Sequence, residues 1–366
     1  MSEAMLFDPL PLREGIVARN RIWLAPLTNM QSHPDGTCSE DERRFLTMRA
    51  EGGFGLVETC AAHVSQEGKA WAGELGVHDD AMIPGLTKLA ASIRAPQPDG
   101  TRALASVQLF HGGLRASEVV SGLPTWSASR YEEGVETIPR EGTEEDLAGA
   151  IDHFARAAER CAKAGFDAIE LHGAHGYLLS QFLSTDYNRR TDGWGGSLEN
   201  RARLIRSVLR AVRDRAPSLV RCVRLSPEDF GQTKGIDVDE AVQTARWLAE
   251  DGMEVLHLSL WRATKNTTKY PDRHATRLFR DALGPKIRIV TAGRILTKDD
   301  AEGQLALGAD AVALGRAAIA NHDWPKKIVD GRPLVMEPVT HEHLLAEGLS
   351  PTFAGYMQKW KGFVRA

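Results

Sequence analysis

The stretch TEEDLAGAIDHFARAAERCAKAGFDAIELHG, Thr143 to Gly173, contains a helix and a strand in the order that decides the fold. Thr143 can cap a helix whose first turn is acidic, and Gly165 ends that helix. Apolar residues recur on one helix face at Leu147, Ile151, Phe154 and Ala158. The next residues, FDAIELHG, are apolar on both faces, as in a strand buried within a parallel sheet. The stretch therefore predicts one unit of an α/β protein.

Seven further apolar runs alternate with charged, amphipathic segments along the chain. They are RIWLAP from Arg21, FGLVETCAA from Phe54, ALASVQLF from Ala103, VRCVRLSP from Val220, MEVLHLSL from Met253, KIRIVTAG from Lys286 and ADAVALGRA from Ala309. Eight such strands, each followed by a helix, predict an α/β fold closed as a (β/α)₈ TIM barrel. We expect one barrel domain over residues 1–337, with a short excursion at Gly112–Thr137 after the third strand. Residues 338–366 are expected to form a helical tail packed on the barrel or on a neighbouring subunit.

The bulk composition argues against several classes of partner. The 366 residues include 45 Lys plus Arg and 49 Asp plus Glu, a net charge of −4 that gives no sign of nucleic-acid or membrane-surface binding. The first residues resemble no signal peptide, and no apolar run approaches the roughly 18 residues of a membrane span. The four cysteines are far apart and form no CxxC motif. We expect a cytoplasmic protein with a small-molecule substrate, and leave open a homo-oligomer.

In a TIM barrel the active site lies at the carboxyl ends of the strands. Polar residues and glycines interrupt the apolar runs at these ends, at Thr28, Thr59, Gln108, His172, His175, Arg224, Gly293, Arg294, Gly315 and Arg316. Most strands therefore contribute to one predicted site.

Glycine followed by arginine after strands seven and eight predicts a phosphate site, because bare backbone N–H groups can approach the oxygens. The two motifs are TAGR, ending at Arg294, and LGRA, which contains Arg316. Gln108 and Arg224 lie in otherwise apolar strands, where a buried amide and a buried cation need partners. A phosphorylated aromatic cofactor such as FMN fits all four features. The plainer alternatives are solvated arginines that follow helix-starting glycines, and a structural ion pair at Arg224.

The segment ELHGAHGYLLSQFL, Glu170 to Leu183, places two histidines three residues apart and a tyrosine two residues further on. This spacing alone permits a metal site, a helix face that carries histidine, or two hydrogen-bond donors and an acid directed at a substrate.

Several long motifs, in the same order, make the chain resemble the Old Yellow Enzyme family of FMN-dependent ene-reductases, also described as NADH:flavin oxidoreductases. The resemblance runs from about Phe7 to Pro325 and is carried by NRIWLAPLT (Asn20–Thr28), SVQLFHGG (Ser106–Gly113), ELHGAHGYLLSQFLS (Glu170–Ser184), NRRTDGWGGSLENRARL (Asn188–Leu204), VRLSP (Val223–Pro227), TAGR and LGR. The resemblance implies non-covalent FMN, with NADH or NADPH as the reductant. It also implies that FMN is held by Ala25, Pro26, Leu27, Thr28, Thr59, Gln108, Arg224, Gly293, Arg294, Gly315 and Arg316.

In this resemblance, His172 and His175 donate hydrogen bonds to a substrate oxygen, and Tyr177 supplies a proton. Phe110 occupies a position that shapes the substrate pocket, and Trp261, just past strand six, is a candidate for the mouth of the site. The metal reading lacks a third ligand, so we expect no metal. His257 has no partner recognisable from the sequence.

The resemblance implies reduction of the activated C=C bond in small α,β-unsaturated carbonyl or nitro compounds. The alternative within the same fold is oxidative N-demethylation or dehydrogenation of a small amine or betaine. A flavin-free aldolase or epimerase would need a Schiff-base lysine or a metal carboxylate set, and strands four to six contain no lysine.

Overall fold

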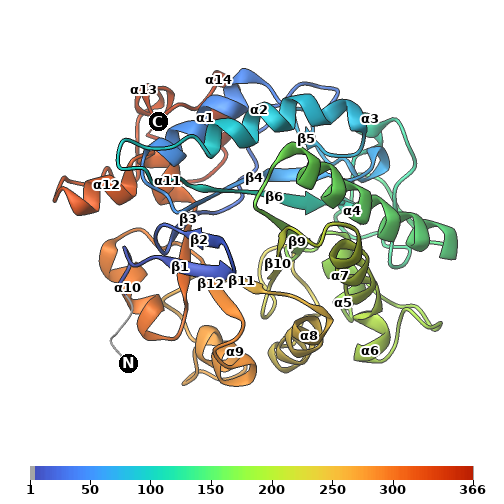
Figure 1. Cartoon of the computed structure of the whole chain (residues 1–366). Helices are drawn as coiled ribbons and strands as arrows, with labels where there is room; N and C mark the ends of the chain where they lie inside the picture. The colour runs from blue at the N-terminus through green and yellow to red at the C-terminus, as the bar shows by residue number, and fades with distance from the viewer. Residues whose placement is uncertain (1–4, 366) are drawn as a thin grey trace.

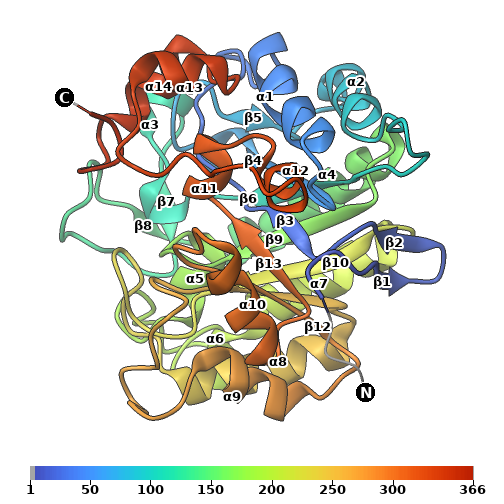
Figure 2. The same ribbon diagram turned by 90° about the vertical axis from the view of Figure 1, so that its left-hand side faces the viewer.

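The computed structural model describes residues 5–365, and its core is a closed barrel of eight parallel strands (Figures 1 and 2). The first strand pairs with both the last strand and the second one, which closes the barrel. The barrel strands are β3 (Ile22–Leu24), β4 (Leu56–His63), β6 (Leu104–Phe110), β9 (Ala168–Gly173), β10 (Val220–Leu225), β11 (Val255–Ser259), β12 (Arg288–Ala292) and β13 (Ala311–Leu314). All eight predicted strands are therefore confirmed.

Helices surround the barrel in the order that the alternating pattern predicts. They are α1 (Glu40–Glu51), α2 (Ile83–Ile93), α4 (Glu144–Ala164), α7 (Arg203–Arg215), α8 (Val238–Asp251), α9 (Ala275–Leu283), α10 (Lys298–Ala306), α11 (Arg316–Ala320) and α12 (Trp324–Val329). Helix α4 begins after the cap Thr143, which forms a capping box with Asp146, and ends at Gly165 in a left-handed conformation. The helical segment after Ser197 is broken at Ala202 into α6 (Leu198–Arg201) and α7.

The strand register brings the polar residues of neighbouring strands side by side. Gln108 of β6 lies opposite Glu170 of β9. Arg224 of β10 lies opposite His172 of β9 on one side and His257 of β11 on the other. Because paired residues of parallel strands point to the same face, these side chains converge inside the barrel.

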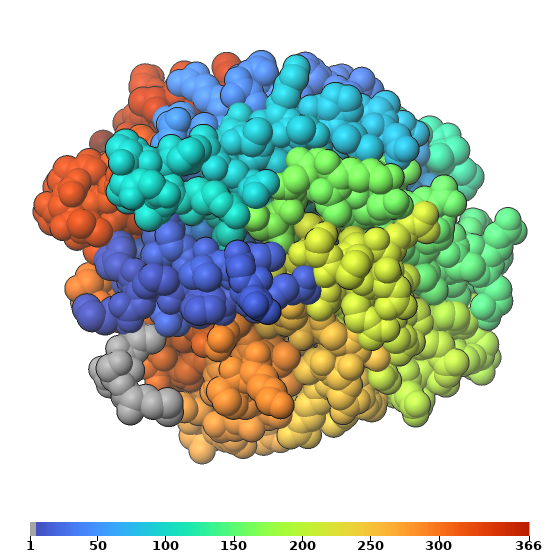
Figure 3. Space-filling model, in the orientation of Figure 1, coloured from blue at the N-terminus to red at the C-terminus, as the bar shows by residue number. Residues whose placement is uncertain are grey.

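A hairpin that the sequence pattern did not predict covers the amino-terminal end of the barrel. It consists of β1 (Leu10–Arg13) and β2 (Ile16–Ala18). Leu10 and Ala18 pack with residues that begin the strands, such as Leu56 and Val255. Figure 3 shows this N-terminal segment at the centre of the visible face. The hairpin therefore covers the end of the barrel away from the carboxyl ends of the strands.

The excursion after β6 and the tail are short additions to the barrel. The excursion contains η3 (Gly113–Arg115), α3 (Glu118–Ser121) and β7 (Trp126–Ser127), which pairs with β8 (Arg140–Glu141). The smaller remaining elements are η1 (Gln66–Gly68), β5 (Leu75–Gly76), η2 (Asp80–Met82) and α5 (Leu178–Leu183). Within residues 5–365, no helix has the length and apolar character needed to cross a bilayer.

The tail contains α13 (His341–Ala346) and α14 (Pro351–Met357), which lie beside α1 in Figures 1 and 2. Buried Arg49 of α1 ties this region together, because its guanidinium donates to the carbonyls of Phe45, Ala318 and Glu347. Phe353 of α14 packs edge-on against Phe45 of α1, with ring centroids 5.2 Å apart. The tail therefore shares the hydrophobic core of the barrel.

Candidate active site

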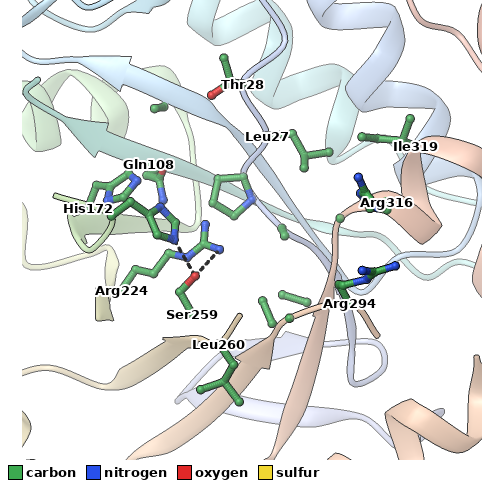
Figure 4. Close-up of a pocket in the computed structure, with 18 of the residues that line it drawn as sticks. Leu27, Thr28, Gln108, His172, Arg224, Ser259, Leu260, Arg294, Arg316 and Ile319 are labelled. Atoms are coloured by element: carbon green, nitrogen blue, oxygen red, sulfur yellow. Dashed lines mark hydrogen bonds between the residues drawn. The ribbon is translucent and has the colours of Figure 1, made fainter. Parts of the chain in front are cut away.

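A cavity of about 320 Å³ opens at the carboxyl ends of the strands, where the barrel fold predicts the site (Figure 4). Thirteen of the sequence-predicted residues line it together: Ala25, Pro26, Leu27, Thr28, Gln108, His172, His175, Tyr177, Arg224, Gly293, Arg294, Gly315 and Arg316. These residues come from six barrel strands and their following loops, and Ala61 of β4 and Ser259 of β11, which also line the cavity, bring in the other two.

Three predicted site residues are not among those that line this cavity. Thr59 is buried in β4, where its hydroxyl donates to the carbonyl of Cys60, and Ala61 is the residue of β4 that lines the cavity. The β4–β6 register shifts between Glu58 and Ala61, which changes the side chain that faces inward. Phe110 is fully buried, and its ring packs against that of Tyr177 at 4.5 Å, so it supports the wall rather than lining it.

Trp261 is the third of these residues. Its side chain is 62% exposed and lines a smaller neighbouring hollow instead of the main cavity. The two hollows share Leu260.

Several cavity residues escaped the sequence analysis. Ser259 ends β11 at the position that the barrel fold marks, so the same argument that selected Thr28 would have found it. The indole of Trp71 and three residues of the tail, Tyr356, Met357 and Trp360, also line the cavity. No local sequence pattern predicts that these tail residues line the cavity, because their position depends on how the tail folds back onto the barrel.

The interior end of the cavity rests on a buried polar layer, which consists of Glu58, Ser106, Gln108, Glu170, Cys222, Arg224 and His257. Glu170 accepts hydrogen bonds from Gln108 Nε2 at 2.7 Å and from Cys222 Sγ at 3.1 Å, and its other contact is His257 Nδ1 at 2.7 Å. His257, for which the sequence offered no partner, is therefore paired with Glu170.

Charge within the polar layer is balanced by Arg224. Burial opposes ionisation of Glu170, but His257 and Arg224 outweigh it and lower the pKa of this carboxyl. Burial, reinforced by the charge of Glu170, raises the pKa of Glu58 well above its ordinary value. Glu58, Glu170 and His257 have ligand-type atoms within 4.8 Å of one another, but the adjacent guanidinium already supplies the positive charge that a cation would bring.

The chemistry of this wall fits the pyrimidine end of a flavin. Arg224 is buried, yet its Nε has no hydrogen-bond partner within residues 5–365. A buried unpaired donor is costly, so a ligand acceptor at this point would relieve it. Gln108, held by Glu170 through its Nε2, keeps its carbonyl oxygen for a ligand donor.

The other end of the cavity fits a phosphate. Gly293 has φ +149°, and a Cβ there would lie 2.5 Å from the carbonyl oxygen of Leu260, so only glycine fits this close approach. Arg294 Nη2 and Arg316 Nη1 each lie 2.9 Å from a carboxylate oxygen of Glu337. These two ion pairs fix the guanidinium groups beside the cavity. The residues present therefore suit FMN from the phosphate to the ring.

His172, His175 and Tyr177 form one group in the cavity wall. The ring centroids of the two histidines are 5.0 Å apart, and that of Tyr177 lies 4.9 Å from that of His172. His175 has φ 59°, a left-handed conformation uncommon outside glycine that suggests a functional constraint. Burial, reinforced by Arg224, lowers the pKa of His172 to about 3 and that of His175 well below its ordinary value. Both imidazoles are therefore neutral near pH 7.

The hydrogen bonds assign a donor nitrogen to each neutral imidazole. The backbone N–H of Ala174 donates to His172 Nδ1 over 3.4 Å, so the ring proton of His172 lies on Nε2. Ser259 Oγ accepts from Arg224 Nη2 at 3.1 Å and lies 2.7 Å from His175 Nε2. With the Ser259 hydroxyl as the donor to His175 Nε2, the proton of the neutral His175 imidazole lies on Nδ1.

The phenol of Tyr177 is neutral at physiological pH. Burial raises the pKa of its phenol above the ordinary value, despite the opposing charge of Arg115. The Arg115 guanidinium lies 4.1 Å from the centroid of the Tyr177 ring, and its Nη1 donates to the carbonyl of His175 at 2.7 Å. Arg115, to which the sequence assigned no role, thus holds the tyrosine and the His175 backbone together.

The fold and the cavity together define a barrel whose residues suit FMN, with two neutral imidazoles and a phenol grouped in the cavity wall. Residues 5–335 match the model of the NADH:flavin oxidoreductase / NADH oxidase family, and the chain belongs to that family. It is an FMN-dependent oxidoreductase that uses NADH or NADPH as the reductant.

Similar proteins and solved structures support this assignment. The chain is 35% identical to the probable NADH-dependent flavin oxidoreductase YqiG of Bacillus subtilis, over 91% of this chain and 90% of the relative. It is 30% identical to the NADH:acrylate oxidoreductase of Vibrio harveyi, over 89% of this chain but only 33% of that longer protein. The solved Old Yellow Enzyme homologue of Zymomonas mobilis has a TM-score of 0.82 and 27% identity, with coverage of 96% of this chain and 99% of that one.

Proposed function

We propose that this enzyme reduces the activated C=C bond of small α,β-unsaturated carbonyl or nitro compounds. The observation that carries the proposal is the group of His172, His175 and Tyr177 in one cavity wall, with two neutral imidazole donors beside a neutral phenol. Bound FMN, once reduced by NADH or NADPH, supplies the hydride for the β-carbon of such a substrate.

The protein residues provide the rest of the chemistry. His172 Nε2–H and His175 Nδ1–H donate to the carbonyl or nitro oxygen and stabilise the negative charge that develops on it as hydride arrives. Tyr177 donates its phenolic proton to the α-carbon, so that hydride and proton together saturate the double bond. Solvent then reprotonates the tyrosinate.

One further point supports this direction of reaction. The name of the Vibrio harveyi relative refers to acrylate, an acid with a conjugated double bond. Arg224 places a fixed positive charge beside the polar end of the cavity, which would stabilise a reduced, anionic flavin and so favour its reduction by NADH or NADPH.

The test is anaerobic stopped-flow reoxidation of the NADPH-reduced enzyme with enones, nitroalkenes and maleimides. The proposal expects rapid return of the oxidised flavin absorbance and a saturated product. In a parallel reaction, the oxidised enzyme is mixed with methylated amines and betaines. Flavin bleaching by an amine, without reoxidation by any conjugated alkene, would replace the proposal with oxidative N-demethylation.

A further inference from the structure

A second hollow of about 190 Å³ adjoins the catalytic cavity. It is formed by the segments that follow β10 and β11, residues 227–230 and 260–268, and it shares Leu260 with the main cavity. Aromatic rings connect the two spaces, because the Phe230 centroid lies 6.0 Å from that of His175 and 6.1 Å from that of Trp261. The hollow therefore lies directly beside the His175 end of the catalytic cavity.

The most exposed part of this hollow is an indole. Trp261 is 62% exposed, although tryptophan is the largest hydrophobic side chain and is usually mostly buried. An exposed indole beside a hollow offers a flat face on which an aromatic base can stack, a contact that contributes strongly to nucleotide binding.

The hollow also carries unpaired positive charge. Among residues 5–365, the side chains of Arg262 and Lys265 have no ion-pair or hydrogen-bond partner within that described span, and both are exposed. Two acids line the same hollow. Glu228 accepts from the N–H of Thr268, and Asp229 accepts from the N–H groups of Gly235 and Ile236, and neither carboxylate is ion-paired with Arg262 or Lys265. The two cations therefore have no side-chain partner within residues 5–365 and can pair with an anionic ligand.

We propose that this hollow binds the adenosine diphosphate end of a ligand whose reactive end lies in the catalytic cavity. Trp261 stacks on the adenine, and Arg262 and Lys265 pair with phosphate oxygens. NADH and NADPH both contain an adenosine diphosphate group. NADPH also carries a 2′-phosphate, so the two unpaired cations should strengthen the binding of NADPH more than that of NADH. A coenzyme A thioester substrate carries the same adenosine diphosphate group. The proposal rests on the proposed role of the main cavity as the flavin and nicotinamide site.

The experiment compares the holoenzyme with Trp261→Ala and with the double variant Arg262→Ala/Lys265→Ala. Lys88→Ala/Lys286→Ala is the matched control, because both lysines are exposed and lie on α2 and before β12, away from the hollow. Flavin reduction is followed anaerobically with NADPH, NADH and reduced nicotinamide mononucleotide, which lacks the adenosine end. Calorimetry with adenosine 2′,5′-bisphosphate measures binding to the hollow directly.

We expect Arg262→Ala/Lys265→Ala to weaken the binding of NADPH and of adenosine 2′,5′-bisphosphate by roughly 3- to 30-fold, which is the loss expected when two exposed charge pairs are removed. NADH should weaken less in this variant, and Trp261→Ala should weaken NADPH and NADH equally. Reduced nicotinamide mononucleotide and the control variant should match the wild type. Dissociation constants for NADPH and the bisphosphate that stay within twofold of wild type in both hollow variants would overturn the proposal.

Two further arms separate the alternatives. Crotonyl-coenzyme A is compared with S-crotonyl-N-acetylcysteamine, which lacks the nucleotide, and a loss confined to the coenzyme A thioester assigns the same subsite to a substrate. Equal losses with reduced nicotinamide mononucleotide would place the effect in the catalytic cavity and refute the proposal. Failure of NADPH and NADH themselves to reduce the wild-type flavin would instead count against the proposed role of the main cavity.

Discussion

His172→Ala provides the sharpest test of how the cavity holds a substrate oxygen. His172 is buried, its Nδ1 accepts from the backbone of Ala174, and its Nε2 has no protein partner within residues 5–365. Nε2–H is therefore the donor left for a ligand. A phenolate is a suitable probe, because its oxygen carries the negative charge that an enolate would develop and its complex with oxidised flavin absorbs at long wavelength.

The expected loss follows from the kind of hydrogen bond removed. A hydrogen bond to a charged acceptor contributes about 1.5–3 kcal/mol, which corresponds to a roughly 10- to 150-fold weaker phenolate affinity. His172→Asn is the matched control, since its amide keeps an N–H donor near the same place. We expect His172→Asn to lose less than half as much binding free energy for the phenolate as His172→Ala loses.

The pH dependence gives a second check. Burial, reinforced by Arg224, lowers the pKa of His172 to about 3, so the imidazole is neutral from pH 5 to pH 8. Binding should therefore follow the ionisation of the phenol alone, and the ratio of variant to wild-type dissociation constants should stay constant. An imidazolium donor would make that ratio grow as the pH falls through about 6.5. Such growth, or a loss below threefold at every pH, would refute the oxygen-binding role.

Three other predictions concern different parts of the molecule. Tyr177→Phe should slow reoxidation by weakly activated enones by about 100-fold or more, with flavin reduction unchanged. Tyr270→Phe, at a half-buried tyrosine that does not line the cavity, should change neither rate in stopped-flow traces. Arg316→Gln should weaken FMN binding to the apoprotein by roughly tenfold, measured by flavin fluorescence, and leave riboflavin unaffected because riboflavin lacks the phosphate. Arg49→Met should lower the free energy of unfolding, measured in urea, by about 3–5 kcal/mol, because buried carbonyls lose their hydrogen-bond donor. The control Arg44→Met, at an exposed arginine, should lower it by less than about 0.5 kcal/mol.

The barrel was predictable because its signal is local and repeated. Each strand is a short run apolar on both faces, and each helix has its own cap and apolar stripe, as α4 shows from Thr143 to Gly165. The hairpin at Leu10–Ala18 was missed for the opposite reason. Its strands are three and four residues long, and Pro11 interrupts the first, so they lack a periodic pattern long enough to recognise.

The site was predictable wherever a residue lies at the carboxyl end of a strand. Gln108, His172 and Arg224 stand out because a polar residue in an apolar strand needs a partner, and the barrel fold places them together. The tail residues Tyr356 and Trp360 reach the same cavity from more than thirty positions beyond the last strand. Their position depends on long-range contacts such as those of Arg49, and no local sequence pattern predicts these contacts.

Thr59, which is not among the residues that line the cavity, shows what limits this kind of inference within a strand. Side chains of a regular strand alternate between the two faces, so Glu58 facing the barrel interior would place Thr59 on the outer face and Cys60 inside. The shift in β4–β6 pairing between Glu58 and Ala61 changes this count by one residue, and Ala61 lines the cavity while Glu58 stays in the polar layer. Bulges of this kind are set by the partner strand and by the side chains packed beneath, such as Ser106 against Glu58. The sequence can therefore predict which strands supply the flavin site more securely than which residue of an irregular strand does so.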